Sequence, residues 1–143
     1  MTDSIFGKIL HANDGSECAF HAFELALLLA KQNNCELHMV SVEEIDYVPE
    51  QIEEVREEAG SAAQRFHSVL QRAQKRADEA QVALHTHVLT GHPVRTVVNI
   101  AAELKAELLV IGARGHSALY ERLVGSRADR IMQLAHCPVL VVK

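Results

Sequence analysis

The chain has few cysteines, no excess of positive charge and no long uncharged run, and each absence removes a class of protein. Cys18, Cys35 and Cys137 make an odd count without a CxxC pair, which favours reduced, buried thiols over a disulfide framework. The net charge of -5 argues against general affinity for nucleic acid or for an anionic membrane. No uncharged run of about 18 residues occurs, and no basic segment precedes an apolar one at the amino end. We therefore expect a cytoplasmic protein that binds neither nucleic acid nor membrane.

Two common nucleotide-binding motifs are also missing. No G-x-G-x-x-G follows the first predicted strand, and no G-x-x-x-x-G-K-[ST] occurs anywhere. The first absence argues against a dinucleotide-dependent oxidoreductase, and the second argues against a P-loop motor.

What the chain does contain is a regular alternation of strand-like and helix-like segments. Its 143 residues, 48% of them hydrophobic, fit a single domain spanning residues 1–143. The predicted elements are a strand at 5–12, a helix from about 16 to 32, a strand at 36–42, a helical stretch ending near 80, a strand at 84–89, a helix at 93–104, a strand at 107–111, a helix from about 126 to 135 and a strand at 139–142.

Alternating strands and helices predict a parallel sheet, because right-handed crossovers place each helix on a face of the sheet. The strands at 107–111 and 139–142 are almost continuously apolar, as expected for strands covered on both faces. The predicted fold class is therefore α/β, with a five-stranded parallel doubly wound sheet of the flavodoxin or Rossmann type and helices on both faces. Periodicity leaves the strand order open. A flavodoxin-like order would bring Asp14 and Gly112 to a crevice beside the first and fourth strands.

The most informative segment follows the strand at 107–111. Gly112, Gly115 and Gly125 are three of only seven glycines, and Ser126 begins the next predicted helix. Glycines let backbone N–H groups approach a ligand closely, and a helix start adds unpaired N–H groups and partial positive charge. This arrangement predicts a phosphate site at the carboxyl end of the strand.

Four blocks of the sequence resemble the universal stress protein family in its nucleotide-binding branch. They are the spacing Gly-x-x-Gly-x9-Gly-Ser at 112–126, HCPVLVV at 136–142, ILHANDGSE at 9–17 and GHP at 91–93. Together the blocks span essentially the whole chain. The resemblance implies strand order 3-2-1-4-5, with ATP bound across the carboxyl ends of the first and fourth strands.

The resemblance also implies the residues of the site. Asn13 and Asp14 would contact the nucleoside, and the backbone at Ser41 and Val42 would meet the adenine. The phosphates would lie against the loop that carries the glycines. Gly112, Gly115, Gly125 and Ser126 match the family's phosphate-loop positions. The predicted site also includes their neighbours Ala113, Arg114, His116 and Arg127, of which the last three could supply positive charge. The implied cofactor is ATP, or ADP or AMP, with or without Mg²⁺, and no catalytic or metal-ligating residue is predicted.

Several of these residues have a plainer interpretation, which the sequence leaves open. Asp14 could cap the first helix instead of contacting ribose hydroxyls. Ser126 with Asp129 resembles a variant capping box, so Ser126 could cap the last helix instead of meeting phosphate. Arg114 and Arg127 could be ordinary exposed side chains.

Four histidines receive separate predictions. His116 stands where the family often has lysine or arginine, so we expect nucleotide binding to tighten as the pH falls from about 8 to about 6. His11 stands where the family usually has an apolar residue, and we expect the core to accommodate it. His85 and His87 lie two apart on one strand and face the same side, which is compatible with one metal ion. Two exposed histidines without a metal are the plainer interpretation.

The resemblance further implies homodimers that pair through the fifth strand, Val139, Leu140, Val141 and Val142. This short apolar strand would otherwise be an uncovered sheet edge. The function that follows is a dimeric, ATP-binding stress-response sensor or regulator that presents different surfaces to an unidentified protein partner when occupied and when empty. Two alternatives stay open. One is a dimeric scaffold without nucleotide, and the other is a slow ATPase or phosphotransferase, for which the sequence offers no clear base.

Overall fold

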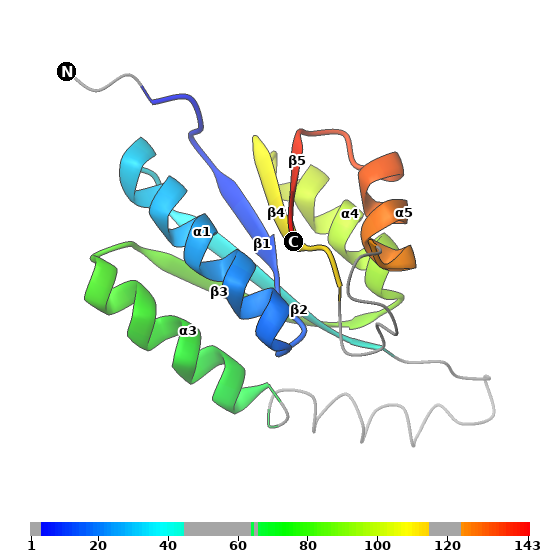
Figure 1. The fold of residues 1–143 in the computed structure, drawn as a ribbon, viewed down its shortest axis with the longest axis horizontal. Coiled ribbons are helices and arrows are strands. Elements are labelled where there is room, and N and C mark those ends of the chain that lie inside the picture. Colours follow the sequence, from blue (N-terminus) through cyan, green and yellow to red (C-terminus); the bar gives the residue numbers. More distant parts are fainter. Residues whose placement is uncertain (1–3, 45–63, 65, 115–123) are drawn as a thin grey trace.

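The computed structural model describes residues 4–44, 64, 66–114 and 124–143 (Figure 1). In this part of the chain, five parallel strands form one sheet in the order β3-β2-β1-β4-β5, which confirms the predicted α/β fold class and strand order. The strands are β1 (Ile9–Ala12), β2 (Leu37–Glu44), β3 (Leu84–Gly91), β4 (Leu108–Gly112) and β5 (Val139–Val142), and the helices are α1 (Glu17–Asn33), α3 (His67–Ala80), α4 (Pro93–Leu104) and α5 (Ser126–Leu134).

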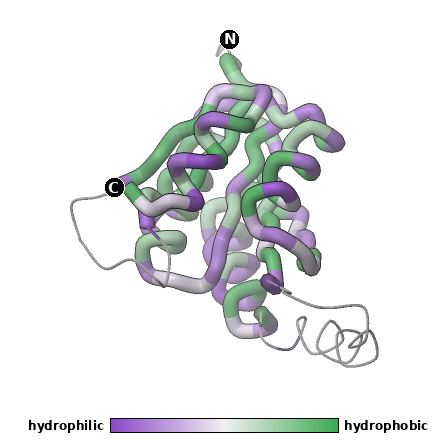
Figure 2. Tube along the Cα trace, turned by 90° about the vertical axis from the view of Figure 1, so that its right-hand side faces the viewer, coloured by the Kyte–Doolittle hydropathy of each residue, from purple (hydrophilic) through white to green (hydrophobic). Residues whose placement is uncertain are grey.

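Helices cover both faces of the sheet. Helices α1 and α3 lie on one face, and α4 and α5 lie on the other (Figure 1). Successive strand residues point to opposite faces, so Ile9 belongs to the core cluster of α1 and α3 while Leu10 belongs to that of α4 and α5. Along the helices, hydrophobic and hydrophilic residues alternate (Figure 2). The helices therefore present an apolar stripe to the sheet and a polar surface to solvent.

Helix α1 begins and ends at residues suited to capping. Ser16 is the N-cap, and its hydroxyl accepts a hydrogen bond from the N–H of Ala19 at 3.1 Å. Asn34 ends the helix in the left-handed conformation, with a φ of 51°. The alternative in which Asp14 caps this helix is therefore wrong. The apolar residues that predicted the helix are all buried, namely Ala19, Phe23, Ala26, Leu27 and Ala30.

The first strand is shorter than predicted. Strand β1 begins at Ile9, and Ile5 is 76% exposed. The N–H groups of Ile5 and Phe6 both donate to Oδ1 of Asn33, at the end of α1. Because a side chain takes these two N–H groups, they do not pair with a neighbouring strand.

Other boundaries also differ from the prediction. Strand β2 continues to Glu44 and β3 to Gly91, because the two strands stay paired over their whole length. Strand β4 covers Leu108–Gly112, one residue later than predicted. Helix α5 ends at Leu134 and leaves Met132 38% exposed, although the spacing predicted that Met132 faces the core.

The three cysteines are half-buried and unpaired, whereas the sequence predicted full burial. Burial raises the pKa of the Cys35 and Cys137 thiols, which keeps both protonated at neutral pH. No helix in the described ranges is long and apolar enough to cross a membrane.

Candidate functional site

The candidate site lies at the carboxyl end of the sheet, where β1 and β4 are neighbours. From β1 the chain enters α1 on one face, and after β4 it continues toward α5 on the other face. A parallel sheet has a crevice at such a point, because the two connections leave in opposite directions. Asn13 and Asp14 follow β1 directly, and Gly112 is the last residue of β4, so all three lie beside this point.

Asn13 is held here by three hydrogen bonds. Its N–H donates to the carbonyl of Val40 at 2.9 Å, and its carbonyl accepts from the hydroxyl of Ser41 at 2.8 Å. Its side-chain Oδ1 accepts from the N–H of Gly15 at 2.8 Å, which orients the amide. Asn13 is 2% exposed, and its Nδ2 is buried with no hydrogen-bond partner in the described structure. A buried donor without a partner costs free energy unless a ligand or a water accepts from it.

The end of β2 offers main-chain groups on the side of Asn13. The carbonyl of Val40 points toward β1, as its bond to Asn13 shows. Because main-chain groups along a strand alternate between its two neighbours, those of Val42 point the same way. The register of β1 with β2 ends at Val40, so Val42 lies beyond the last paired residue, and Ser41 between them is fully buried. Strand β2 therefore presents a short main-chain edge beside Asn13.

The first and last parts of the glycine motif, at Gly112–Ala113 and at Gly125, lie next to each other. The N–H of Gly125 donates to the carbonyl of Ala113 at 2.7 Å, and the N–H of Ala113 donates to the carbonyl of Val142 in β5 at 2.8 Å. At Gly112, an added Cβ would lie 3.2 Å from the carbonyl oxygen of Cys18 in the first turn of α1. Gly112 therefore allows β4 to pack closely on α1, a requirement that the motif alone did not reveal.

Helix α5 begins at Ser126, directly after Gly125. Gly125 is the N-cap, and within the described residues no side chain makes a cap hydrogen bond to this helix. The alternative in which Ser126 and Asp129 form a capping box is therefore wrong. The first N–H groups of the helix have no partner within it and carry partial positive charge toward the site.

Arg127, in the first turn of α5, pairs with Glu44 at the end of β2, with 2.5 Å between Nη2 and Oε2. The pair joins two elements that are 83 positions apart in the sequence, and both side chains are about half exposed. Sequence reasoning missed Glu44, because it lies two residues past the predicted end of its strand.

His11 lies in β1 and is fully buried, as predicted. Its Nδ1 is 2.9 Å from the carbonyl oxygen of Val110, and its ring lies 5.6 Å from that of Phe23. Burial lowers the pKa of His11 to about 4, although the bond to Val110 and the charge of Asp14 act to raise it. His11 is therefore neutral at pH 7 and donates from Nδ1. Its Nε2 is buried and has no partner among the described residues.

The structure brings most of the predicted site residues together. At the carboxyl ends of β1, β2 and β4 and at the start of α5 lie Asn13, Asp14, Ser41, Val42, Gly112, Ala113, Arg114, Gly125, Ser126 and Arg127. The remaining two, Gly115 and His116, lie outside the described residues.

The sequence matches the universal stress protein family over residues 6–143. Universal stress protein MJ0531 of Methanocaldococcus jannaschii is 34% identical over an alignment of 151 positions, which covers 99% of this chain and 84% of that protein. Universal stress protein YxiE of Bacillus subtilis is also 34% identical over an alignment of 151 positions, which covers 97% of this chain and 100% of that protein.

Solved structures share the fold. Universal stress protein UspA from Lactobacillus plantarum superimposes with a TM-score of 0.86 at 26% identity, covering 99% of this chain and 100% of that one. A universal stress protein solved in complex with cAMP superimposes with a TM-score of 0.76 at 24% identity, covering 98% of this chain and 99% of that one. The second likeness is one of fold alone.

Proposed function

The chain belongs to the universal stress protein family, and from this premise we propose that it binds an adenine nucleotide at the carboxyl end of its sheet. The nucleotide is ATP, or ADP or AMP, and it lies in the crevice between β1 and β4. In this proposal the chain is a member of the nucleotide-binding branch and acts in the cytoplasm as a dimeric sensor. The bound nucleotide changes the surface that the dimer presents to a protein partner.

The observation that carries the proposal is the buried Nδ2 of Asn13. An amide N–H at the end of β1 with no partner among the described residues fits an acceptor on a nucleoside, such as a ribose oxygen. Asp14 comes next in the chain, and its Oδ1 accepts from the N–H of Ser16 at 3.0 Å, which holds the carboxylate at the same point. A carboxylate repels phosphate, so the role that suits Asp14 is to accept from ribose hydroxyls.

The main-chain edge at Val42 supports a place for the adenine. An adenine ring offers both a donor and acceptors along one edge, and a strand offers an N–H and a carbonyl in the same spacing. Because β1 has ended at this level, the groups of Val42 that point toward β1 lie on the side of Asn13. Adenine and ribose would then be held by neighbouring strands.

The start of α5 supports a place for the phosphates. Its N-cap is a glycine, Ser126 is an exposed first residue, and no side chain in the described ranges takes the first N–H groups. Free N–H groups and the partial positive charge of a helix start favour an anion. Mg²⁺ would accompany the phosphates and keep much of its water shell.

The fold itself accommodates such a ligand, since the protein solved with cAMP shares it. That protein is 24% identical to this chain, and we take from it only that an adenine nucleotide fits a sheet of this kind.

We also propose a homodimer that pairs through β5. This strand is an edge of the sheet. The carbonyl of Pro138 accepts from the N–H of Leu109 in β4, and the carbonyl of Val142 accepts from the N–H of Ala113, directly after β4. Because main-chain groups alternate, those of Val139 and Val141 point away from β4. They form an edge on which a second copy can pair, which would cover the strand.

A pair of proline substitutions tests the dimer. Val141→Pro removes an outward N–H and leaves the bonds between β4 and β5 in place. Thr86→Pro does the same at the other edge of the sheet. The carbonyl of Ala83, directly before β3, accepts from the N–H of Leu37 in β2, and Thr86 lies three residues further along, so its main-chain groups point away from β2. We expect dimers for the wild type and Thr86→Pro and a monomer for Val141→Pro in sedimentation velocity. A monomeric wild type, or a dimeric Val141→Pro, would contradict this interface.

Calorimetric titration of the tag-free, nucleotide-stripped protein with ATP and Mg²⁺ at pH 7 tests nucleotide binding. Asn13→Asp keeps the acceptor for Gly15 and replaces the Nδ2 donor with oxygen, so affinity should fall by about tenfold or more. Asn99→Asp makes the same chemical change at an exposed position of α4 and should leave affinity unchanged. Absence of saturable binding by the wild type would contradict the proposal and favour the nucleotide-free scaffold.

A further inference from the structure

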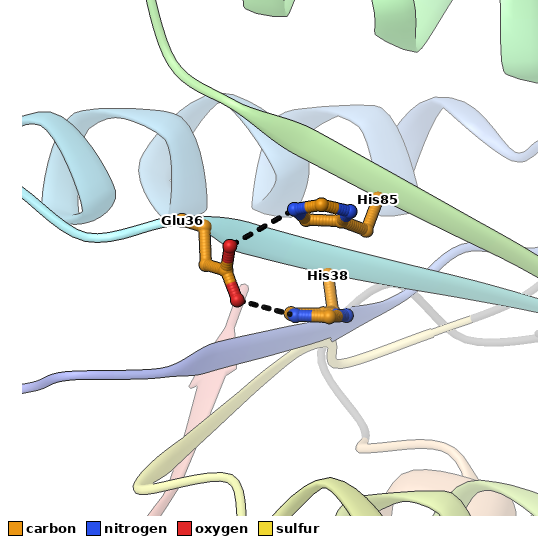
Figure 3. Close-up of side chains that lie close together, drawn as sticks. All are labelled: Glu36, His38 and His85. Atoms are coloured by element: carbon orange, nitrogen blue, oxygen red, sulfur yellow. Dashed lines mark hydrogen bonds and ion pairs between the residues drawn. The ribbon is translucent and has the colours of Figure 1, made fainter.

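At the amino end of the sheet, acidic and imidazole side chains from two neighbouring strands form a cluster (Figure 3). Glu36 directly precedes β2, His38 lies in β2, and His85 lies opposite His38 in β3. His38 is two residues before Val40, so both lie on the face that α4 and α5 cover. The strand register therefore brings together three side chains that are separated in sequence.

The geometry of the cluster is compact. Oε1 of Glu36 is 3.2 Å from Nε2 of His38, and Oε2 of Glu36 is 2.9 Å from Nε2 of His85. Figure 3 shows both imidazoles with a ring nitrogen turned toward this one carboxylate. The two rings are stacked, with centroids 4.7 Å apart and planes at 20°. One ligand atom from each of the three residues lies within 4.8 Å of the other two.

We propose that Glu36, His38 and His85 form a binding site for a divalent transition metal ion, with Zn²⁺ the best match. Two imidazole nitrogens and one carboxylate oxygen are a donor set that Zn²⁺ takes, with water as the fourth ligand. Bonds of about 2.0–2.2 Å in a tetrahedral site place the ligand atoms about 3.3 Å apart. The two distances from Glu36 oxygens to imidazole Nε2 atoms, 3.2 Å and 2.9 Å, are close to this value. One ligand atom of each residue lies within 4.8 Å of the other two, so side-chain rotations can bring all three donors onto one ion.

His87 supplies the positioning contact that such a site requires. The spacing of His85 and His87 is compatible with one metal ion held by both, whereas the structure places Nε2 of His87 3.1 Å from Nδ1 of His38. When Nε2 of His38 binds the metal, its Nδ1 carries the proton and donates to His87. A ligating histidine normally has a partner of this kind, which fixes its tautomer and ring orientation.

The cluster and the nucleotide crevice lie at opposite ends of β2. This strand has eight residues, Leu37–Glu44, which span roughly 25 Å. Glu36 lies just before its first residue, whereas the crevice lies near its last. The proposed metal site therefore does not depend on the proposed nucleotide site, and each can be tested without the other.

The test uses tag-free, metal-free, full-length protein. Titration with ZnSO₄ is followed by calorimetry, and titration with CoCl₂ is followed by visible absorption, because tetrahedral Co²⁺ gives an intense band. We expect one metal ion per chain. His85→Ala should lower the affinity by more than about a hundredfold, and Glu36→Gln and His87→Ala should each lower it by about tenfold or more. His85 is exposed and Glu36 is half-buried, so these two variants should stay folded.

His21→Ala is the matched control, because it removes an exposed imidazole from α1, on the other face of the sheet. Its metal affinity should equal that of the wild type. His38 is 7% exposed, and its role is tested without substitution by the shift of its Nε2 resonance on addition of Zn²⁺. Absence of saturable binding, or binding that His85→Ala leaves unchanged, would overturn the proposal and leave the cluster as a hydrogen-bond network between β2 and β3.

Discussion

At the carboxyl end of the sheet, Asn13 is held by hydrogen bonds that involve main-chain groups, whereas at the amino end the clustered side chains are held by one another. Asn13 donates from its N–H to the carbonyl of Val40, and its side-chain Nδ2 has no partner in the described structure. In the amino-end cluster, Glu36, His38 and His85 are joined through side-chain atoms alone. The first region offers a donor to a ligand, and the second offers a set of atoms that already lie around a common point.

The two ends of the sheet differ in how closely ligand binding is coupled to folding. The carboxyl end depends on close backbone contacts, such as that of Gly112 with Cys18, so a substitution there changes the fold as well as the site. At the amino end, Glu36 and His85 are about half exposed, so they can be replaced while the sheet stays intact.

The largest expected effect concerns His11, whose buried ring, unlike those of His38 and His85, makes no hydrogen bond to a carboxylate in the described structure. Its pKa is about 4 in the folded protein and 6.5 as its ordinary value. Above pH 6.5 its contribution to stability is fully present. As the pH falls toward 4, the unfolded chain binds a proton that the folded chain excludes, so the free energy of unfolding falls by about 3 kcal/mol.

Urea unfolding of the wild type and His11→Leu, measured between pH 7 and pH 4, isolates this effect. The carboxylates common to both proteins titrate in both, so the difference between the two curves reports His11. We expect His11→Leu to lose about 3 kcal/mol less than the wild type over this range. Parallel curves would assign the acid sensitivity to other groups.

The next prediction compares the two ends directly. Gly112→Ala places a Cβ 3.1 Å from Sγ and 3.2 Å from the carbonyl oxygen of Cys18, and should lower the free energy of unfolding by about 1–3 kcal/mol. Glu36→Gln changes a side chain that is 42% exposed and should change it by less than about 0.5 kcal/mol. Chemical denaturation at pH 7 measures both, and equal losses would remove the contrast between the two ends.

A smaller effect is expected for Ser126→Ala, which removes a hydroxyl that does not cap α5 and that we propose contacts phosphate. Because no side chain caps α5 in the described structure, Ser126→Ala should change the free energy of unfolding by less than about 0.5 kcal/mol. Loss of one hydrogen bond to phosphate should weaken ATP binding by about twofold to tenfold and leave adenosine binding unchanged. Calorimetry with the two ligands checks this. An equal loss for ATP and adenosine would exclude a phosphate contact.

The smallest effect on ATP affinity is expected for the pair of Arg127 and Glu44. Both side chains are about half exposed, so a double-mutant cycle with Arg127→Ala and Glu44→Gln should give a coupling below about 1 kcal/mol. In the proposed site, Glu44 competes with phosphate for Arg127. Glu44→Gln should therefore strengthen ATP binding and Arg127→Ala should weaken it, each by less than about fivefold. Changes of the same sign in both variants would contradict this competition.

Elements whose signals are local in sequence could be predicted well. The helix at 93–104 begins with a proline and has a regular apolar spacing, and the strand at 139–142 is a continuous apolar run; both match the structure. The start of β1 could not be predicted, because the N–H of Ile5 is taken by Asn33, 28 positions away. No pattern within the first strand carries that information.

The same distinction holds for the candidate sites. The glycine motif and the segment after β1 are continuous in sequence, and the structure places their described residues together. Of the amino-end cluster, only the spacing of His85 and His87 was visible. Glu36 and His38 join it through the register of β2 with β3, a long-range property that periodicity does not encode.

Amide NMR spectra recorded during titration with ATP and Mg²⁺ report both ends of the sheet at once and so test whether the nucleotide binds at the carboxyl end. We expect saturable shifts at the amides of Asn13, Val42 and Ala113, and none at those of His38 and His85. Saturation without shifts at the carboxyl end, or the absence of any shift at millimolar ATP, would contradict nucleotide binding at that end.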